Sequence, residues 1–223
     1  MAAPVVEAQT ENSGSSSNPA AALPASIASG ELLFLFFASD AAGQSIGTPT
    51  DWTLLVTQTN ARVFYKIATG SEGSTVTVPF TPNARPWAAR SFRVSGHNSS
   101  SAPEAASATG TGTSPDAPSL TPTGGSKEYL WIWSVHVGDE DFGAGTVSSF
   151  PTNYTTNADQ VGTTAAAVGT SYRANTASSE NPGTGTLSAG APWTAVTIAV
   201  YPVEGGGGST LAAGTLAMMG VGL

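Results

Sequence analysis

Two histidines have the residue type that acid–base catalysis uses most often. His97 lies in the turn Gly96-His97-Asn98, and His136 lies in an apolar run that also contains Ser134 and Ile132. A hydrolytic triad needs a histidine close to both a nucleophile and a carboxylate. The surroundings of these two histidines do not indicate such a grouping. We therefore expect both histidines to be packed or surface residues, and we expect the chain not to be an enzyme.

Acidic residues offer a second kind of chemistry. Asp139, Glu140 and Asp141 form the densest acidic run, and oxygen ligands of this kind bind calcium. The run lacks the alternating spacing of a calcium loop, so we expect a solvated acidic turn and no cofactor, with these three residues as the metal candidates. Two carboxylate pairs of the kind that glycosidases use are Asp51 with Asp159 and Glu72 with Glu180. We expect each pair to occupy equivalent turns of a duplicated sequence, which would favour a structural role.

Aromatic residues could form a platform for sugar rings. The candidates are Trp52, Trp87, Trp193, Tyr65 and Tyr172. They recur at corresponding places in both halves of the chain, as core residues of a duplicated fold would. We expect core positions and keep a glycan-binding surface as the alternative.

An internal duplication supplies the elements that position these residues. Glu31 to Phe36 aligns with Glu128 to Trp133, and Pro49-Thr50-Asp51-Trp52 aligns with Pro151-Thr152-Asn153-Tyr154. Tyr65, Pro86 and Trp87 have counterparts in the same order, at Tyr172, Pro192 and Trp193. The offset of roughly 100 residues indicates two related repeats. We place repeat one at 4–96 and repeat two at 103–203.

Each of the aligned sequence blocks in the two repeats is expected to form a short strand. The blocks are rich in β-branched and aromatic residues and are bounded by Gly, Pro, Asn and Ser, a pattern typical of all-β proteins. We therefore predict an antiparallel, jelly-roll-like β-sandwich over 4–203, built from two duplicated halves related by a pseudo-twofold. Two separate small sandwiches are the alternative.

Two strands are apolar on both faces. Leu32 to Ala38 and Tyr129 to Trp133 lack the polar alternation of a half-exposed strand. A two-sheet sandwich covers one face, so the other needs cover from the N-terminal arm, a loop of the same chain or a neighbouring subunit. Exposed apolar patches mark interfaces, and we therefore predict Phe34 and Phe36 at an interface with another subunit.

The C-terminal segment 204–223 has a different composition from the rest. Four consecutive glycines, Gly205 to Gly208, predict a flexible hinge. The peptide behind it has no charge, and its larger side chains predict a second interface with a neighbouring subunit: Leu211, Leu216, Met218, Met219 and Leu223. A frayed end is the alternative.

Composition limits the partners. Charged residues make up 10% of the chain, against about 25% in ordinary domains, and the net charge is −8. No basic run is present, so nucleic-acid binding is not expected. No apolar stretch is long enough for a membrane span, and the first seven residues do not resemble a signal peptide. With no cysteine, disulfides are excluded. The surface suits a protein that is packed against copies of itself or located outside a cell.

The combined pattern resembles a family of virion structural proteins of tailed bacteriophages and prophages. The resemblance covers about 4–203 and rests on Ala28 to Leu33, Thr48 to Leu55, Phe64 to Glu72 and Arg93 to Gly96, with Asn181 to Thr184 and Trp193 to Thr197 in the second half. It implies a non-enzymatic protein located in the virion and synthesised in the host cytoplasm. Its partners would be the major capsid protein or tail proteins and copies of itself. We expect a capsid decoration or cement protein. A tail or fibre component and a glycan-binding adsorption module are the alternatives.

Overall fold

The computed structural model describes residues 2–40, 45–81, 83–138, 146–154 and 156–204, and all of the regular structure in them is β-strand. The acidic candidates Asp139, Glu140 and Asp141 lie outside the described residues, as does the segment 205–223 with its five predicted interface residues. The described strands form two five-stranded antiparallel sheets and four two-stranded ribbons. The prediction of an all-β sandwich is confirmed.

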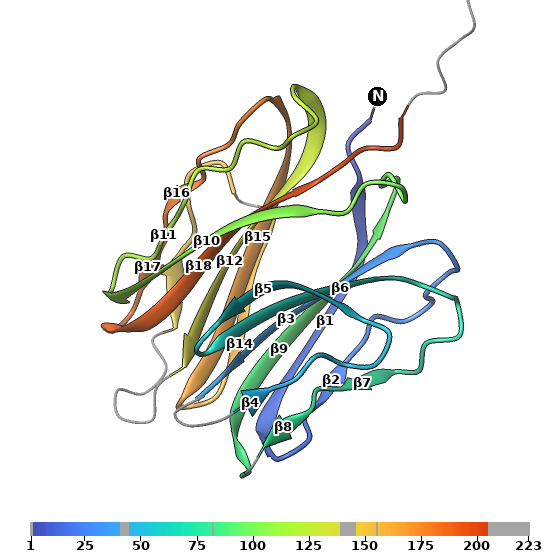
Figure 1. Ribbon diagram of the computed structural model, residues 1–223. Helices are drawn as coiled ribbons and strands as arrows, with labels where there is room; N and C mark the ends of the chain where they lie inside the picture. Colours follow the sequence, from blue (N-terminus) through green and yellow to red (C-terminus); the bar gives the residue numbers. More distant parts are fainter. Residues whose placement is uncertain (1, 41–44, 82, 139–145, 155, 205–223) are drawn as a thin grey trace, which may run out of the picture.

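Each repeat builds one whole sheet, and Figure 1 shows the two sheets as two layers. The first sheet has the order β1 (Val5–Ser16), β9 (Arg85–Ser95), β3 (Leu32–Ser39), β6 (Ala61–Ile67) and β5 (Thr53–Gln58). The second has the order β10 (Glu104–Gly112), β18 (Ala191–Val200), β12 (Lys127–Gly138), β15 (Ala166–Ala177) and β14 (Thr156–Gly162). Adding nine to the number of each strand in the first sheet gives the strand order of the second sheet, so the two sheets have the same topology.

The ribbons follow the same rule. In repeat one, β2 (Ala20–Ala22) pairs with β7 (Thr75–Thr77), and β4 (Ser45–Ile46) pairs with β8 (Phe80–Thr81). In repeat two, β11 (Asp116–Ala117) pairs with β16 (Gly183–Thr184), and β13 (Val147–Ser149) pairs with β17 (Thr186–Leu187). The duplication therefore extends to the smallest described elements.

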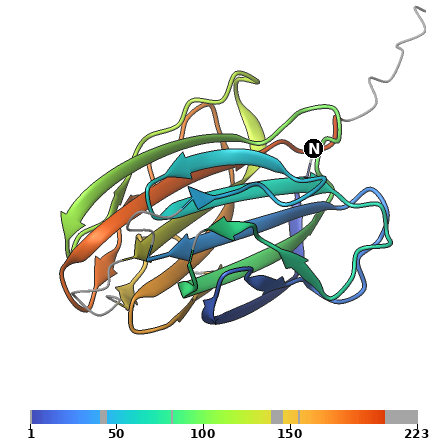
Figure 2. The same cartoon turned by 60° about the horizontal axis from the view of Figure 1, so that its bottom comes forward.

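The sheets stack so that edge strands of different repeats meet. Ser13 of β1 donates to the carbonyl of Gly162 at the end of β14 (3.3 Å), and Gln58 of β5 donates to Ser107 of β10 (3.1 Å). Figure 2 shows β10, in light green, running beside β5, in cyan. Exchanging the repeats turns the β1–β14 contact into the β10–β5 contact, which is the relation that a pseudo-twofold axis between the sheets produces.

The main core lies between the sheets. Phe34 and Phe36 point into it from β3, together with Phe92 of β9 and Ile132 and Ile198 of the second sheet. Both Phe34 and Phe36 are 0% exposed within the single chain. The prediction that they form an interface with another subunit is therefore wrong, because the facing sheet of the same chain covers them.

The outer faces of the sheets are covered by the ribbons and loops of their own repeats. Leu33, Leu35 and Phe37 pack under a cover that includes Leu23, Ile46, Trp52, Val78 and Phe80. Tyr129, Trp131 and Trp133 pack under Leu120, Val147, Tyr154 and Leu187. A neighbouring subunit is thus not needed to explain why β3 and β12 are apolar on both faces.

Equivalent turns deliver one aromatic residue to each cover. The Trp52 amide donates to the carbonyl of Pro49 (3.1 Å), and the Tyr154 amide donates to that of Pro151 (3.0 Å). The residues before them, Asp51 and Asn153, have φ values of 63° and 71°. Asp and Asn tolerate this left-handed conformation better than other side chains do, which explains their place in both turns.

The strand register corrects one step of the sequence alignment. Leu32 pairs with Val94, and Leu130 pairs with Val200, so Leu32 corresponds to Leu130 and not to Tyr129. Both leucines face the core between the sheets, whereas Tyr129 faces outward. A shift of one residue turns a strand over, and strands that are apolar on both faces give no signal that would reveal it.

Candidate functional site

Ser134 and His136 form a hydrogen-bonded pair, but they lie inside the sandwich. His136 is 0% exposed, with Nδ1 3.1 Å from the carbonyl oxygen of Phe37 and Nε2 3.1 Å from the Ser134 hydroxyl. A carbonyl only accepts hydrogen bonds, so Nδ1 carries the proton and Nε2 of the neutral ring accepts from Ser134. Burial lowers the pKa of His136 to about 4. The pair links β12 to β3 across the core and is closed to a substrate.

One pattern of nucleophilic catalysis was overlooked in the sequence. Gly43-Gln44-Ser45-Ile46-Gly47 matches Gly-x-Ser-x-Gly, which positions the nucleophile of α/β-hydrolases at a turn between a strand and a helix. Ser45 instead lies in the short strand β4, paired with Thr81 of β8. The described part of this segment is therefore an antiparallel ribbon and lacks the setting that the motif requires.

Glu72 and Glu180 hold equivalent turns in place. Lys66 forms an ion pair with Glu72 (3.2 Å), and its counterpart Arg173 forms one with Glu180. Glu72 also accepts hydrogen bonds from the backbone amides of Thr69 (2.8 Å) and Gly70 (2.9 Å). Burial raises the pKa of Glu72, but the hydrogen bonds from Thr69 and Lys66 outweigh it and bring the pKa to about 2. Both carboxylates are thus engaged in structural contacts.

The expectation that Asp51 and Asp159 occupy equivalent turns is wrong, because the counterpart of Asp51 is Asn153, and Asp159 lies in strand β14.

Most of the proposed glycan platform is core. Trp52, in the cover of the first sheet, is 8% exposed, and Trp87, on the covered face of β9, is 5% exposed. Tyr172 packs between the sheets. Trp193 is half-buried and lies over Gly110 of β10, where a Cβ would come within 2.3 Å of the indole. In the other repeat, Trp87 lies opposite Gly14 in the same way.

Three arginines make contacts within the chain. Arg85 pairs with Asp40 (3.2 Å) and Arg93 with Glu31 (3.0 Å), both within the first repeat. Arg90 is 1% exposed and bonds to Glu11 and to Gln9 of β1. These ion pairs all join parts of the first repeat.

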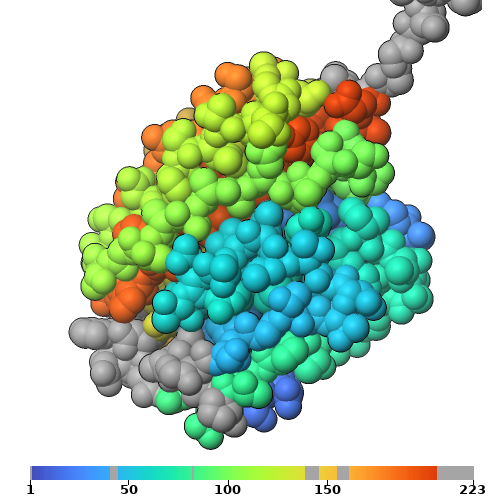
Figure 3. Space-filling view, in the orientation of Figure 1, coloured from blue at the N-terminus to red at the C-terminus, as the bar shows by residue number. Residues whose placement is uncertain are grey.

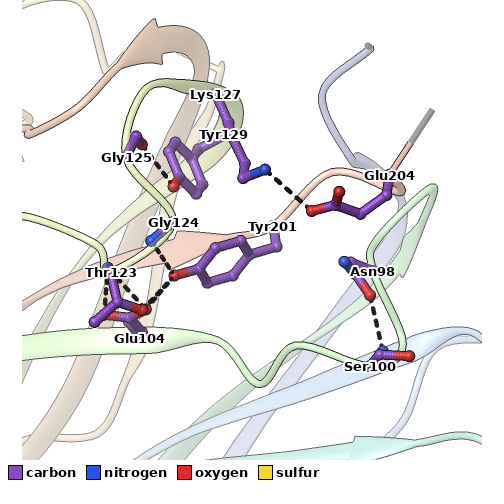
Figure 4. Close-up of polar contacts among 10 residues, drawn as sticks. All are labelled: Asn98, Ser100, Glu104, Thr123, Gly124, Gly125, Lys127, Tyr129, Tyr201 and Glu204. Atoms are coloured by element: carbon purple, nitrogen blue, oxygen red, sulfur yellow. Dashed lines mark hydrogen bonds and ion pairs between the residues drawn. The ribbon is translucent and has the colours of Figure 1, made fainter. Parts of the chain in front are cut away.

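A polar pocket lies at the end of the sandwich where the two repeats are connected (Figure 4). We call it the Tyr201 pocket. Its volume is about 470 Å³, and it is lined by Ser101, Ala102, Pro103, Glu104, Thr123, Gly124, Lys127, Tyr201 and Glu204. Glu104 accepts hydrogen bonds from the Tyr201 hydroxyl and from both the amide and the hydroxyl of Thr123. Burial raises the pKa of Glu104, but these hydrogen bonds outweigh it and leave it lowered.

The same network fixes the last described residues. The Asn98 amide donates to the carbonyl of Tyr201 (2.9 Å), and the Val203 amide donates to that of Gly96 (3.0 Å). Lys127 forms an ion pair with Glu204 (3.0 Å). The residues from which the segment 205–223 continues are therefore anchored to the loop between the repeats and to β12.

A second pocket, which we call the Asn60 pocket, lies where the β5–β6 turn meets the second sheet. It has a volume of about 510 Å³ and is lined by Asp40, Gln58, Thr59, Asn60, Thr109, Gly110, Thr111, Gly138, Pro192, Trp193 and Thr194. Asn60 bridges the sheets, since its amide nitrogen donates to Gly138 (3.3 Å) and its oxygen accepts from Thr194 (3.1 Å). Hydroxyl and amide groups of this kind suit a neutral polar ligand.

Comparisons of the chain with protein-family models, curated proteins and solved structures gave no significant match.

Of the residues that line the two pockets, sequence reasoning had named only Trp193 as a functional candidate, for a glycan platform. One usable signal was divergence between the repeats, because Tyr129 and Tyr201 correspond by register to Glu31 and Ser95. Tyr129 and Tyr201 stack edge-to-face at 5.2 Å, and burial and the neighbouring Tyr201 raise the pKa of Tyr129 to about 12. In the part of the chain that the structure describes, there is no cluster of three potential metal ligands, and no helix has the length and apolarity to cross a bilayer.

Proposed function

We propose that this chain is a non-enzymatic structural protein of a tailed-phage virion, held in the capsid by neighbouring subunits as a decoration or cement protein. The observation that carries the proposal is the anchored base of the uncharged C-terminal segment. Val203 and Glu204 are bonded to Gly96 and Lys127 at one end of the sandwich, and the 19 residues that follow contain no charged side chain. This combination suits a body that presents an apolar peptide to a neighbour.

The rest of the molecule is consistent with a scaffold. Both sheets have their outer faces covered by their own ribbons, and the hydroxyl–imidazole pair in β12 is buried. The carboxylates of Glu72 and Glu180 form ion pairs that hold equivalent turns in place. The resemblance of the sequence to tailed-phage structural proteins points to the same class of role.

Energetics explains why the peptide would act in an assembly. Burying Leu216, Met218, Met219 and Leu223 would each contribute about 1.5–3 kcal/mol, while ordering the backbone costs about 1–2 kcal/mol per residue. Over residues 216–223 the four side chains supply about 6–12 kcal/mol against an ordering cost of about 8–16 kcal/mol, so docking of a single chain is marginal at best. In a symmetric particle many copies act together, and avidity multiplies a small net gain.

Deleting the residues after Gly208 tests the proposal. We expect the truncated chain to keep its thermal midpoint and to attach more weakly than the full chain to capsids assembled without it, as measured by co-sedimentation. A control chain of full length, with Leu216, Met218, Met219 and Leu223 replaced by Ser, should behave like the truncated one. Attachment as tight as that of the full chain in either variant would contradict the docking role.

A glycan-binding adsorption module is the second candidate. The Asn60 pocket favours it, because its amide and hydroxyl groups could bind a polyhydroxylated ligand. Retention of a glycan by the isolated chain on an array, lost on replacing Asn60, would favour this alternative over a capsid role.

A further inference from the structure

The four edge strands of the sandwich are protected to different degrees. An edge strand can pair with another chain, and bulges, charges and short length are common protections. The register of β1 shifts between Val6 and Ala8, and this strand carries Glu7 and Glu11. The registers of β5 and β14 shift as well, between Leu54 and Val56 and between Thr156 and Asp159.

β10 has none of these protections along most of its length. It pairs with β18 in unbroken register, from Glu104 opposite Ala199 to Gly112 opposite Ala191. After Glu104 it contains only Ala, Ser, Thr and Gly, and Thr109 and Thr111 are exposed. Among the described strands β10 pairs only with β18, and Figure 3 shows its surface, in light green, exposed beside that of β5, in cyan.

We infer that β10 is a homotypic docking edge, at which two copies of this chain pair antiparallel about a twofold axis at Ala108. An antiparallel edge that meets its own copy is self-complementary, as a twofold dimer requires. Pairing would join two five-stranded sheets into one continuous ten-stranded sheet. This inference goes beyond the virion role, because it concerns the isolated chain in solution.

Charge favours this register. With Ala108 on the axis, Glu104 lies opposite Gly112 of the partner subunit, and the two Glu104 carboxylates lie at opposite ends of the joined strands. Eight residues of strand separate them, about 27 Å. Like charges directly opposite each other destabilise a sheet, and this arrangement has none along β10. The small side chains let the two backbones approach.

Chain direction favours a second copy over the C-terminal segment of the same chain. Glu204 and Glu104 line the same pocket, so the segment 205–223 continues from the end of the molecule at which β10 begins. Running along β10 from there, the segment would pair parallel to it, and parallel pairing is slightly less stable per residue than antiparallel pairing.

Lysine substitutions test which edge is used. Thr109→Lys would place the lysines of the two copies diagonally across the twofold axis. Ser13 is the exposed residue of β1 that corresponds to Thr109 by strand register, so Ser13→Lys is the matched control. By sedimentation equilibrium we expect the full chain and Ser13→Lys to form dimers at about 100 μM, and Thr109→Lys to weaken association about tenfold or more. A monomeric full chain, equal effects of both lysines, or dimers lost on deleting 209–223 would overturn the inference.

Single cysteines test the register, since the chain has none of its own. Opposed residues in an antiparallel pair have Cα atoms about 4.5–5.5 Å apart, which a disulfide can span. We expect Ala108→Cys to form covalent dimers under mild oxidation and Thr111→Cys to form none, because the two Thr111 positions lie about 20 Å apart. Equal cross-linking by both variants, or none by Ala108→Cys, would contradict pairing about Ala108.

Discussion

Replacing Phe36 by alanine is expected to lower the free energy of unfolding by about 3–5 kcal/mol. The ring is 0% exposed and packs edge-to-face on Phe92, with ring centroids 5.1 Å apart, and beside Phe34 at 5.9 Å. Its loss leaves a cavity between two sheets whose backbones are each fixed by antiparallel pairing, so the site cannot close completely. Urea unfolding of the isolated chain measures the change.

The matched control is Ile67→Ala on the neighbouring strand β6. Ile67 is 39% exposed, so its truncation should cost less than about 1 kcal/mol. If Phe36→Ala were as mild as Ile67→Ala in the isolated chain, the placement of Phe36 in the core between the sheets would be wrong. An interface with another subunit would then be the better explanation.

Acidification from pH 6.5 to pH 4 is expected to cost the folded protein about 3 kcal/mol through His136 alone. Burial lowers the pKa of His136 to about 4, whereas the histidine of an unfolded chain titrates near its ordinary value of about 6.5. Between these values the unfolded state binds a proton that the folded state does not. The contribution of His136 is therefore fully present above pH 6.5 and is lost as the pH falls to 4.

His136→Asn tests this window, because the asparagine amide can still donate to the carbonyl of Phe37. The variant should be less stable at pH 7, and its stability should fall less steeply with acid in urea unfolding between pH 7 and pH 4.5. His97 also has a pKa lowered by burial, so His97→Asn is the control and should keep most of the wild-type slope. Parallel pH curves for His136→Asn and the wild type would contradict the neutral buried imidazole.

The duplicated fold could be predicted because its turns carry distinctive residues. Pro49 with Trp52 and Pro151 with Tyr154 recur in order, and the left-handed conformation at Asp51 and Asn153 restricts which residues fit between them. The exact register could not be predicted in the same way. Leu32 to Ala38 is apolar on both faces, so a shift of one residue leaves the pattern unchanged.

The ribbons that cover the sheets were not predicted, and cover by the same chain was only the alternative, for a physical reason. The ribbons that shield β3 and β12 have strands of only two or three residues, which is too short for any periodicity to appear in the sequence. Their absence from the prediction led to the wrong interface at Phe34 and Phe36.

The pockets depend on contacts between distant residues. Glu104 and Tyr201 are 97 residues apart in the chain, and Asn60 and Thr194 are 134 apart. No local pattern brings such pairs together. The signal that the sequence offers is a residue whose type differs from that of its counterpart in the other repeat, as Tyr201 differs from Ser95.

The location of the chain in purified virions tests the proposed role most directly. Cryo-electron microscopy of particles from a host lysate that contains this protein should show the two-layered sandwich at repeated positions on the capsid, with Glu204 directed toward a neighbouring subunit. Density only on the tail or fibres would contradict the capsid assignment. Absence of the chain from purified particles, by both imaging and mass spectrometry, would contradict a structural role in the virion.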